Sequence, residues 1–175
     1  MQLQSLIRTI PDYPKAGILF RDITTLLQDP EGFRATVAEL LAALKGITAH
    51  KVVGIEARGF ILGGVVAHAL GAGFVPIRKK GKLPGATLGE DYELEYGTDR
   101  LEIHSDALNE GDDVLVIDDL IATGGTLQAA CRLIERMNAR VIACAAVIDL
   151  PDLGGSAKLE DEGYRIISLC EFSGS

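Results

Sequence analysis

The segment Val114–Thr126, with the sequence VLVIDDLIATGGT, contains the residues best suited to chemistry. An apolar run leads to two adjacent carboxylates, Asp118 and Asp119, and then to a short loop rich in glycine and threonine. Glycines let a backbone turn tightly and bring N–H groups against an anion, and a helix start adds partial positive charge. The spacing therefore predicts a phosphate cradle without lysine, formed by Ala122, Thr123, Gly124, Gly125 and Thr126.

The two carboxylates precede this cradle by one short loop. Carboxylates accept hydrogen bonds from hydroxyls strongly, so Asp118 and Asp119 suit the diol of a ribose attached to the phosphate. Competing phosphate motifs fail, because the Walker pattern is missing and Gly71-Ala72-Gly73 lacks the third glycine of a dinucleotide fingerprint. The alternative is that this segment binds no ligand and is only a strand, an acidic turn and a threonine-capped helix. Two acidic residues at the end of a buried strand argue against it, because burying charged groups without partners is costly.

The charge of the chain limits the classes of partner. The 175 residues carry a formal net charge of -8, with a sequence pI near 4.9. A general nucleic-acid binder should be basic, so we expect no nucleic-acid partner, whereas a small anionic substrate remains compatible. The relevant basic residues should be few and clustered, as they are in the sequence RKKGK at Arg78–Lys82. For any single lysine there, a solvated charge is the alternative.

We expect a soluble, cytoplasmic chain that does not enter a membrane. Apolar runs such as Val141–Ile148 are far too short to span a bilayer, and the N-terminal sequence lacks the pattern of a secretory signal. The cysteines, Cys131, Cys144 and Cys170, have no metal-ligand spacing and are predicted to be reduced thiols in the core.

Strands alternate with helices along the chain, which predicts one α/β domain over residues 1–175 with a mostly parallel, twisted central sheet flanked by helices. Asp29 and Pro30 are typical of a helix start, and Gly46 of its end. The other expected elements are strands at Lys51–Ile55, Phe74–Ile77, Asp113–Ile117, Arg140–Ile148 and Tyr164–Leu169, and helices at Gly59–Leu70 and Thr126–Asn138. Ligands of such sheets bind beyond the carboxyl ends of the strands.

Residues 79–102 interrupt this alternation, because they are rich in glycine, charge and tyrosine. A segment of that length between core elements is more often a functional flap or small subdomain than an idle loop. We expect a mobile loop over Lys79–Gly89 and a hairpin over Tyr92–Ile103, which together form a flap or hood.

The Val114–Thr126 segment closely resembles the motif with which type I phosphoribosyltransferases bind phosphoribosyl pyrophosphate (PRPP). In that family the acidic pair holds the ribose hydroxyls and the ATGGT loop holds the 5′-phosphate. The resemblance implies these roles for Asp118 and Asp119 and for Ala122 through Thr126, together with the type I phosphoribosyltransferase fold. The motif leaves the base open, because purine and pyrimidine enzymes share it.

A second segment, DYPKAGILFRDIT at Asp12–Thr24, resembles the adenine-recognition segment of adenine phosphoribosyltransferases. The resemblance implies that Phe20 stacks on adenine and that Leu19 and Arg21 supply backbone and nearby contacts. Stacking tolerates any base, so contacts at the base edge must provide selectivity. Without the resemblance, a plain core aromatic is the better interpretation of Phe20.

The loop EARG at Glu56–Gly59 follows an expected strand, where an arginine can bind a pyrophosphate. In the family this loop contacts the pyrophosphate and contains a non-proline cis peptide. Arg78–Gly85 resembles the family's basic flap loop, which helps to neutralise pyrophosphate. The implied pyrophosphate contacts are Glu56, Ala57, Arg58, Arg78, Lys79 and Lys82. A surface or packing role is the alternative for Arg58.

The sequence ELEYG at Glu93–Gly97 resembles the flap motif in which a glutamate approaches the purine. On a strand Glu93 and Glu95 face the same way, so spacing alone does not choose between them. The resemblance favours Glu95 as the acid–base residue, with Tyr96 beside it and Arg58 as the second catalytic residue. Without it, both glutamates are solvent-facing.

The resemblance covers about Asp12 to Asp149 and implies a purine-salvage transferase that acts as a homodimer. Its ligands would be adenine, PRPP, AMP and pyrophosphate, with Mg²⁺ carried by PRPP or pyrophosphate and no direct protein ligand to the metal. Ala16, Glu56 and Ala57 stand where other members carry proline or aspartate–serine, which leaves the local loop geometry open.

Two alternatives remain. The nearest is a phosphoribosyltransferase for guanine, hypoxanthine or xanthine, against which the ILFR sequence at Ile18–Arg21 argues. The other is a PRPP- or nucleotide-sensing regulator that has lost catalysis. A regulator should carry a nucleic-acid-binding element or a basic face, and this short acidic sequence offers neither.

Overall fold

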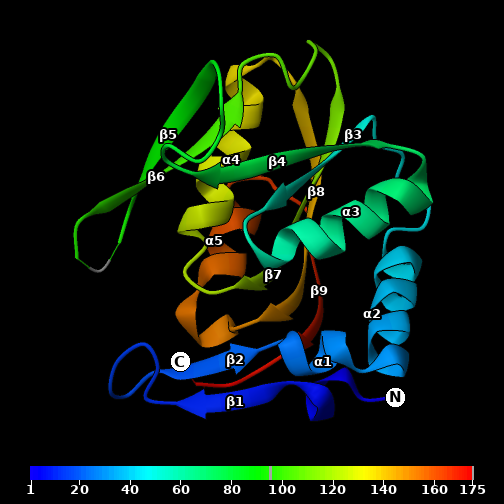
Figure 1. Cartoon of the computed structure of the whole chain (residues 1–175), viewed down its shortest axis with the longest axis vertical. Helices are drawn as coiled ribbons and strands as arrows, with labels where there is room; N and C mark the ends of the chain where they lie inside the picture. Colours follow the sequence, from blue (N-terminus) through cyan, green and yellow to red (C-terminus); the bar gives the residue numbers. More distant parts are fainter. Residues whose placement is uncertain (95, 175) are drawn as a thin grey trace.

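The computed structural model describes residues 1–94 and 96–174 and is built around a seven-stranded sheet (Figure 1). The strands lie in the order β5-β6-β4-β3-β7-β8-β9. Their bounds are β3 Lys51–Ile55, β4 Gly73–Lys79, β5 Thr87–Glu93, β6 Thr98–His104, β7 Asp113–Ile121, β8 Arg140–Asp149 and β9 Ile166–Glu171. From β4 to β9 all neighbours are parallel, whereas β6 pairs antiparallel with β4 and β5. The predicted mostly parallel α/β sheet is confirmed.

Helices cover both faces of the sheet (Figure 1). Their bounds are α1 Thr24–Gln28, α2 Pro30–Ala43, α3 Arg58–Leu70, α4 Gly125–Arg136 and α5 Gly155–Asp161, with 3₁₀ turns η1 at Leu3–Leu6 and η2 at Pro151–Leu153. On β3, Val52 packs into the core that contains α2 and α3, whereas Val53 packs into the core that contains α4. Both faces are therefore buried, which explains why the central strands are almost continuously apolar.

The start of α2 follows the sequence prediction. Asp29 precedes the helix with extended backbone, and its Oδ1 accepts a hydrogen bond from the Gly32 N–H at 2.8 Å. Pro30 occupies the first turn, where its missing N–H would have had no helical partner. The expected end of α3 is also confirmed, because Gly71 caps the helix in the left-handed conformation with φ of 67°.

Strand β7 is longer than predicted. It continues beyond Ile117 to Ile121, so the acidic pair lies within the strand and not after its end. The reason is tertiary, since this part of β7 keeps its parallel pairing with β8, from Asp118 opposite Ala146 to Ile121 opposite Asp149. The expected last strand also begins and ends later, at Ile166–Glu171.

The flap region contains a longer hairpin than expected. Strands β5 and β6 pair antiparallel from Thr87 opposite His104 to Glu93 opposite Thr98. Thr87–Gly89 were therefore wrongly assigned to a loop, because cross-strand pairing, which the sequence does not display, extends the strand. Glu95, the proposed acid–base residue, lies outside the described residues.

A separate two-stranded sheet near the N-terminus has no counterpart in the sequence prediction. It consists of β1 (Arg8–Pro11) and β2 (Leu19–Asp22), paired antiparallel. Most of the segment resembling the adenine-recognition element lies in β2 and in the turn before it. This hairpin forms its own small layer beside the end of the chain (Figure 1).

Burial of the cysteines agrees with the sequence prediction for two of them. Cys131 and Cys144 are buried free thiols, whereas Cys170 is only partly buried. The neighbouring Cys144 thiol, together with burial, raises the pKa of Cys131, so this thiol stays protonated. In the part of the chain that the structure describes, no helix combines the length and apolar character needed to cross a bilayer.

Candidate active site

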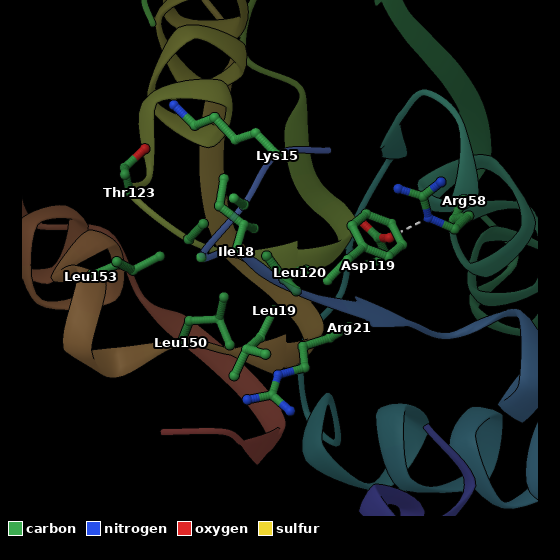
Figure 2. Close-up of a pocket in the computed structure, with 14 residues that line it drawn as sticks. Lys15, Ile18, Leu19, Arg21, Arg58, Asp119, Leu120, Thr123, Leu150 and Leu153 are labelled. Carbon is green, nitrogen blue, oxygen red and sulfur yellow. Dashed lines mark hydrogen bonds and ion pairs between the residues drawn. The ribbon is translucent and has the colours of Figure 1, made fainter. Parts of the chain in front are cut away.

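A pocket of about 590 Å³ lies between the β1–β2 hairpin and the carboxyl ends of β7 and β8 (Figure 2). One wall comes from the turn before β2 and from β2 itself, including Phe20. The other comes from the end of β7 and the loop before α4, including Asp119 and Thr123. The two segments that the sequence assigned to a base and to PRPP, far apart in the chain, therefore line one cavity.

A smaller cavity of about 160 Å³ continues along the loop that leads into α4. We call Ala122–Thr126 the phosphate loop. Its Gly124 adopts φ of 85°, a conformation that favours glycine, and α4 begins at the next residue. No side chain of the described residues caps this helix, so its first N–H groups remain available to an anion. Asp118 also lines this cavity.

The two carboxylates of the acidic pair have different surroundings. Asp118 is buried, and burial followed by the charge of Asp119 raises the pKa of Asp118 well above its usual range. Its Oδ1 accepts a hydrogen bond from the Asp119 backbone N–H at 2.8 Å. Asp119 faces the larger pocket, where its Oδ2 accepts a hydrogen bond from Nε of Arg58 (Figure 2). Asp119 is therefore the more accessible hydroxyl acceptor.

Arg58 is the first residue of α3 and follows the cis peptide bond between Glu56 and Ala57. Burial opposes its charge, but the hydrogen bond and charge of Asp119 outweigh that cost and raise the pKa of Arg58. The next residue, Gly59, lets α3 approach β7 closely, since an added Cβ would lie 2.9 Å from the Ile117 carbonyl oxygen. This packing holds the Arg58 guanidinium opposite the acidic pair.

Glu56 contacts the basic residues at the end of β4 and just after it. Its carboxylate accepts hydrogen bonds from the Lys79 backbone N–H at 2.7 Å and from Nζ of Lys82 at 2.9 Å, and the Arg78 guanidinium lies 3.5 Å away. Burial opposes ionisation of this carboxyl, but these contacts together lower the pKa of Glu56. The basic cluster therefore stands beside Ala57 and Arg58 with an internal counter-ion.

The side chain of Lys79 is bound to the hairpin. Its Nζ donates a hydrogen bond to Oη of Tyr92 at 2.6 Å and pairs with the Asp99 carboxylate. Oη of Tyr92 donates to the same carboxylate at 3.1 Å. The hydrogen bond from Lys79 is the main cause that lowers the pKa of Asp99. The cation that the sequence assigned to pyrophosphate is thus paired within the protein.

On the base side, Phe20 lines the pocket and contacts a second aromatic residue. The Tyr13 ring meets it edge to face, with centroids 5.2 Å apart. Arg21 lines the pocket, but its guanidinium donates hydrogen bonds to Thr9 Oγ1 at 2.6 Å and to the Ser173 carbonyl at 3.0 Å. That side chain therefore connects the hairpin to the C-terminal segment.

Sequence reasoning missed three residues that line the pocket, Leu120, Leu150 and Leu153. Four further lining residues lie within the segment 12–24 assigned to adenine recognition but were given no individual role, namely Lys15, Ala16, Gly17 and Ile18. Leu150 and Leu153 face the hairpin from the segment after β8 (Figure 2). Only their position after the carboxyl end of a parallel strand could have indicated them. Lys15 also contacts the flap, because its Nζ lies 5.0 Å from the ring centroid of the exposed Tyr96.

The sequence profile described as the phosphoribosyl transferase domain matches residues 24–171. This match includes the acidic pair, the phosphate loop and the flap. The chain therefore belongs to the phosphoribosyl transferase family.

Individual relatives identify the branch of that family. The adenine phosphoribosyltransferase of Nitrosospira multiformis is 60% identical over 175 residues, with all of both chains covered. The crystal structure of adenine phosphoribosyltransferase from Thermoanaerobacter pseudethanolicus is 48% identical, with a TM-score of 0.94 over 98% of each chain. That of Giardia lamblia, complexed with 9-deazaadenine, is 40% identical, with a TM-score of 0.92 over 97% of this chain and 96% of that one. Within the family, this chain groups with the adenine phosphoribosyltransferases.

Proposed function

We propose that this protein transfers the 5-phosphoribosyl group of PRPP to N9 of adenine, giving AMP and pyrophosphate, as an enzyme of purine salvage. One observation carries the proposal. The pocket that contains Phe20 also contains Asp119, Arg58 and Thr123, so a base, a ribose and its phosphates fit along one continuous surface. The high identity to enzymes named adenine phosphoribosyltransferase supports adenine as the base.

In this proposal the phosphate loop binds the 5′-phosphate through the backbone N–H groups of Gly124 and Gly125 and the hydroxyls of Thr123 and Thr126. Asp118 and Asp119 accept hydrogen bonds from the ribose hydroxyls. The ring of Phe20 stacks on adenine, and backbone groups of Leu19 and Arg21 read its edge. These contacts place N9 in line with the anomeric carbon, and catalysis arises chiefly from positioning and electrostatic stabilisation.

The leaving pyrophosphate needs cations. Arg58 pairs with the acidic pair, and the other proposed cations, Arg78, Lys79 and Lys82, lie on the basic segment. Glu56 and Ala57, which directly precede Arg58, complete the proposed pyrophosphate site. Arg58, Lys79 and Lys82 are paired with Asp119, Asp99 and Glu56. Binding of the diphosphate must therefore replace internal carboxylates as the partners of these cations.

The proposal assigns residues 79–102 to a flap over the reaction and residues 12–24 to adenine recognition, within one domain over residues 1–175. Closure of the flap would exclude water, which otherwise could hydrolyse PRPP. Glu95 is the proposed proton carrier at the purine, with Tyr96 beside it. Glu95→Gln should lower kcat about 10²-fold while leaving PRPP affinity nearly unchanged, as steady-state kinetics would measure. Unchanged turnover would remove Glu95 from the mechanism.

Mg²⁺ is proposed to arrive with PRPP. Asp118 and Asp119 offer oxygen donors, which suit this ion, but the described residues contain no group of three or more side chains that could hold a metal. When bound, the ion would neutralise negative charge on the diphosphate and so stabilise it as a leaving group. We further propose a cytoplasmic homodimer, on the basis of the family resemblance alone.

The proposed function is tested with the purified protein, PRPP and Mg²⁺, offering adenine, guanine, hypoxanthine and xanthine separately. Chromatography of the products should show AMP from adenine and no nucleotide from the other bases. GMP, IMP or XMP would contradict the assignment of the base pocket. Binding of PRPP without any product would contradict the enzymatic function and favour a PRPP sensor.

A further inference from the structure

The start of α5 packs directly against the phosphate loop (Figure 1). Helix α5 begins at Gly155, after the segment that follows β8. Gly155 is buried, and its backbone N–H donates a hydrogen bond to the Ala122 carbonyl oxygen at 3.1 Å. A residue outside every recognised motif thus bonds to the first residue of the phosphate loop.

The absence of a side chain at Gly155 is required by this contact. An added Cβ would lie 2.4 Å from the Ala122 carbonyl oxygen and 2.6 Å from both the Thr123 carbonyl carbon and the Gly124 nitrogen. These distances are about 1 Å shorter than an ordinary contact between non-bonded heavy atoms. All three neighbours are backbone atoms of consecutive residues, so no side chain can turn aside to make room.

The contact is reciprocal. A Cβ added at Gly124 would lie 3.0 Å from the Gly155 carbonyl oxygen and 3.1 Å from its Cα. The two backbones therefore touch through two glycines, and neither has room for a side chain at this contact. The backbone nitrogen of Gly124, which would lie 2.6 Å from a Cβ added at Gly155, is one of the proposed phosphate donors.

Neighbouring bonds fix the segment that carries Gly155. Before it, the Leu150 N–H donates to the Ile121 carbonyl at 3.0 Å. After it, the Ser156 hydroxyl donates to Oδ2 of the buried Asp149 at 2.7 Å. Because both ends of the segment are held, a Cβ at Gly155 would displace the phosphate loop more readily than α5.

We propose that Gly155 is a positioning residue for the reaction, which sets the backbone of the phosphate loop and hence the affinity for the 5′-phosphate. This inference rests on the proposed function of that loop. A misplacement of about 1 Å can cost about 10²-fold in rate or affinity when donors are preorganised. The residue acts through Ala122–Gly124 and does not itself touch the ligand.

The test compares the wild type with Gly155→Ala and with the matched control Gly64→Ala, which adds the same methyl group within α3 where no atom lies within 4 Å. Steady-state kinetics give KM for PRPP, KM for adenine and kcat, and inhibition against PRPP gives the affinity for AMP. Gly155→Ala should raise KM for PRPP and weaken AMP inhibition by about tenfold or more, and change KM for adenine by less than about twofold. The control should match the wild type.

A merely structural effect gives a different result. Partial unfolding lowers the active concentration and hence the apparent kcat, but leaves KM for PRPP unchanged. An unchanged KM for PRPP, or an equal increase in KM for adenine, would overturn the proposal while AMP formation by the wild type upholds the function. If the wild type forms no nucleotide, the proposed function is wrong, and the role of Gly155 is tested by measuring AMP binding with calorimetry. Weaker AMP binding by Gly155→Ala than by the wild type would then support the role, and equal binding would overturn it.

A second variant keeps the test decisive if circular dichroism shows that Gly155→Ala does not fold. Ser156→Ala removes the hydroxyl that ties the first turn of α5 to Asp149 and adds no atom near the loop. It should raise KM for PRPP by about threefold with little change in KM for adenine, since the support is loosened without a direct clash. Equal changes in both KM values would contradict the proposal.

Discussion

In the proposed mechanism the phosphate loop and the flap bind the same ligand, but the protein holds these two regions by different kinds of contact. The loop is held by backbone, through the meeting of Gly124 with Gly155 and the hydrogen bond from Gly155 to Ala122. The cations of the flap are held by charge, as in the pairing of Lys79 with Asp99 and of Lys82 with Glu56. The phosphate loop is thus held by close backbone packing, whereas the cations are held by carboxylates that an anionic ligand can replace.

This difference matches the chemistry of the two ends of PRPP. The 5′-phosphate is the same in the substrate and in AMP, so a preformed backbone site can hold it throughout the reaction. The pyrophosphate must be bound and then released, which suits cations that return to internal carboxylates. Arg58 belongs to the second kind of contact, although its partner Asp119 lies only three residues before the start of the phosphate loop.

The largest expected effect comes from removing the cation between the two regions. Arg58→Ala should lower kcat/KM for PRPP by about 10²–10³-fold, because one preorganised group that stabilises the leaving pyrophosphate is lost. Affinity for AMP, which has no pyrophosphate, should change far less. Steady-state kinetics and calorimetry measure the two quantities.

The matched control is Arg34→Ala, which removes an arginine from an exposed ion pair with Glu31 on α2. It should leave both quantities near the wild-type values, since exposed pairs contribute little. If Arg58→Ala lowered the affinity for AMP by as large a factor as kcat/KM for PRPP, the two regions would not act separately.

The base wall should respond independently of both regions. Phe20→Leu should raise KM for adenine about tenfold, because base–aromatic stacking contributes about 1–3 kcal/mol, and should leave KM for PRPP nearly unchanged. Phe74→Leu serves as the control, since this exposed ring meets the Phe60 ring edge to face and lies outside the pocket. An unchanged KM for adenine would return Phe20 to the role of a packing residue.

The exchange of partners at the flap predicts a gain in affinity. Asp99→Asn removes the internal counter-ion of Lys79 and should lower KM for PRPP about threefold, because the freed cation is available to the diphosphate and exposed pairs are worth about 0–1 kcal/mol. Asp91→Asn is the control on the same hairpin, where the carboxylate pairs with Arg100 instead. A rise in KM for PRPP with Asp99→Asn would show that the pair supports the bound state.

The smallest effect concerns the strand that carries the base wall. Burial opposes ionisation of Asp22 at the end of β2, but hydrogen bonds from Thr24 and Arg8 outweigh it and lower its pKa from 3.8 to about 2. A lowered folded-state pKa contributes stability above the unfolded value, and this contribution is lost as pH falls from about 4 to about 2. Thermal unfolding of Asp22→Asn should therefore show a lower Tm than the wild type at pH 7 and converge with it near pH 2.

Asp106→Asn is the control for this pH dependence, because the exposed Asp106 side chain makes no hydrogen bond to another described residue. Its Tm should follow the wild type at every pH. A constant difference between Asp22→Asn and the wild type from pH 7 to pH 2 would mean that packing, and not ionisation, is responsible.

The sequence predicted the central sheet and most of its helices because burial on both faces leaves a strong apolar pattern. It did not predict β1 and β2. The residues of β1 are mostly exposed, those of β2 range from exposed to buried, and neither strand shows a clear alternation. It also ended β7 too early, because pairing with β8 carries the strand through Asp118 and Asp119. Local pattern thus specifies the core, whereas short or polar strands depend on their tertiary neighbours.

For the site, motifs indicated residues that the fold does bring around one pocket, including Phe20, Arg58 and Asp119. The partners of the cations could not be predicted, because Lys79 and Asp99 come together only through the hairpin. Gly155 gave no signal either, since its importance arises from a contact with a loop distant in sequence.

The most direct test of the contrast between the two regions is a crystal structure of the protein with AMP, pyrophosphate and Mg²⁺, compared with the unliganded protein. We predict that the Cα atoms of Ala122–Thr126 move by less than about 1 Å, whereas Arg58, Lys79 and Lys82 leave their carboxylate partners and contact the pyrophosphate. A rearranged phosphate loop, or a pyrophosphate bound while all three internal ion pairs remain intact, would contradict the account.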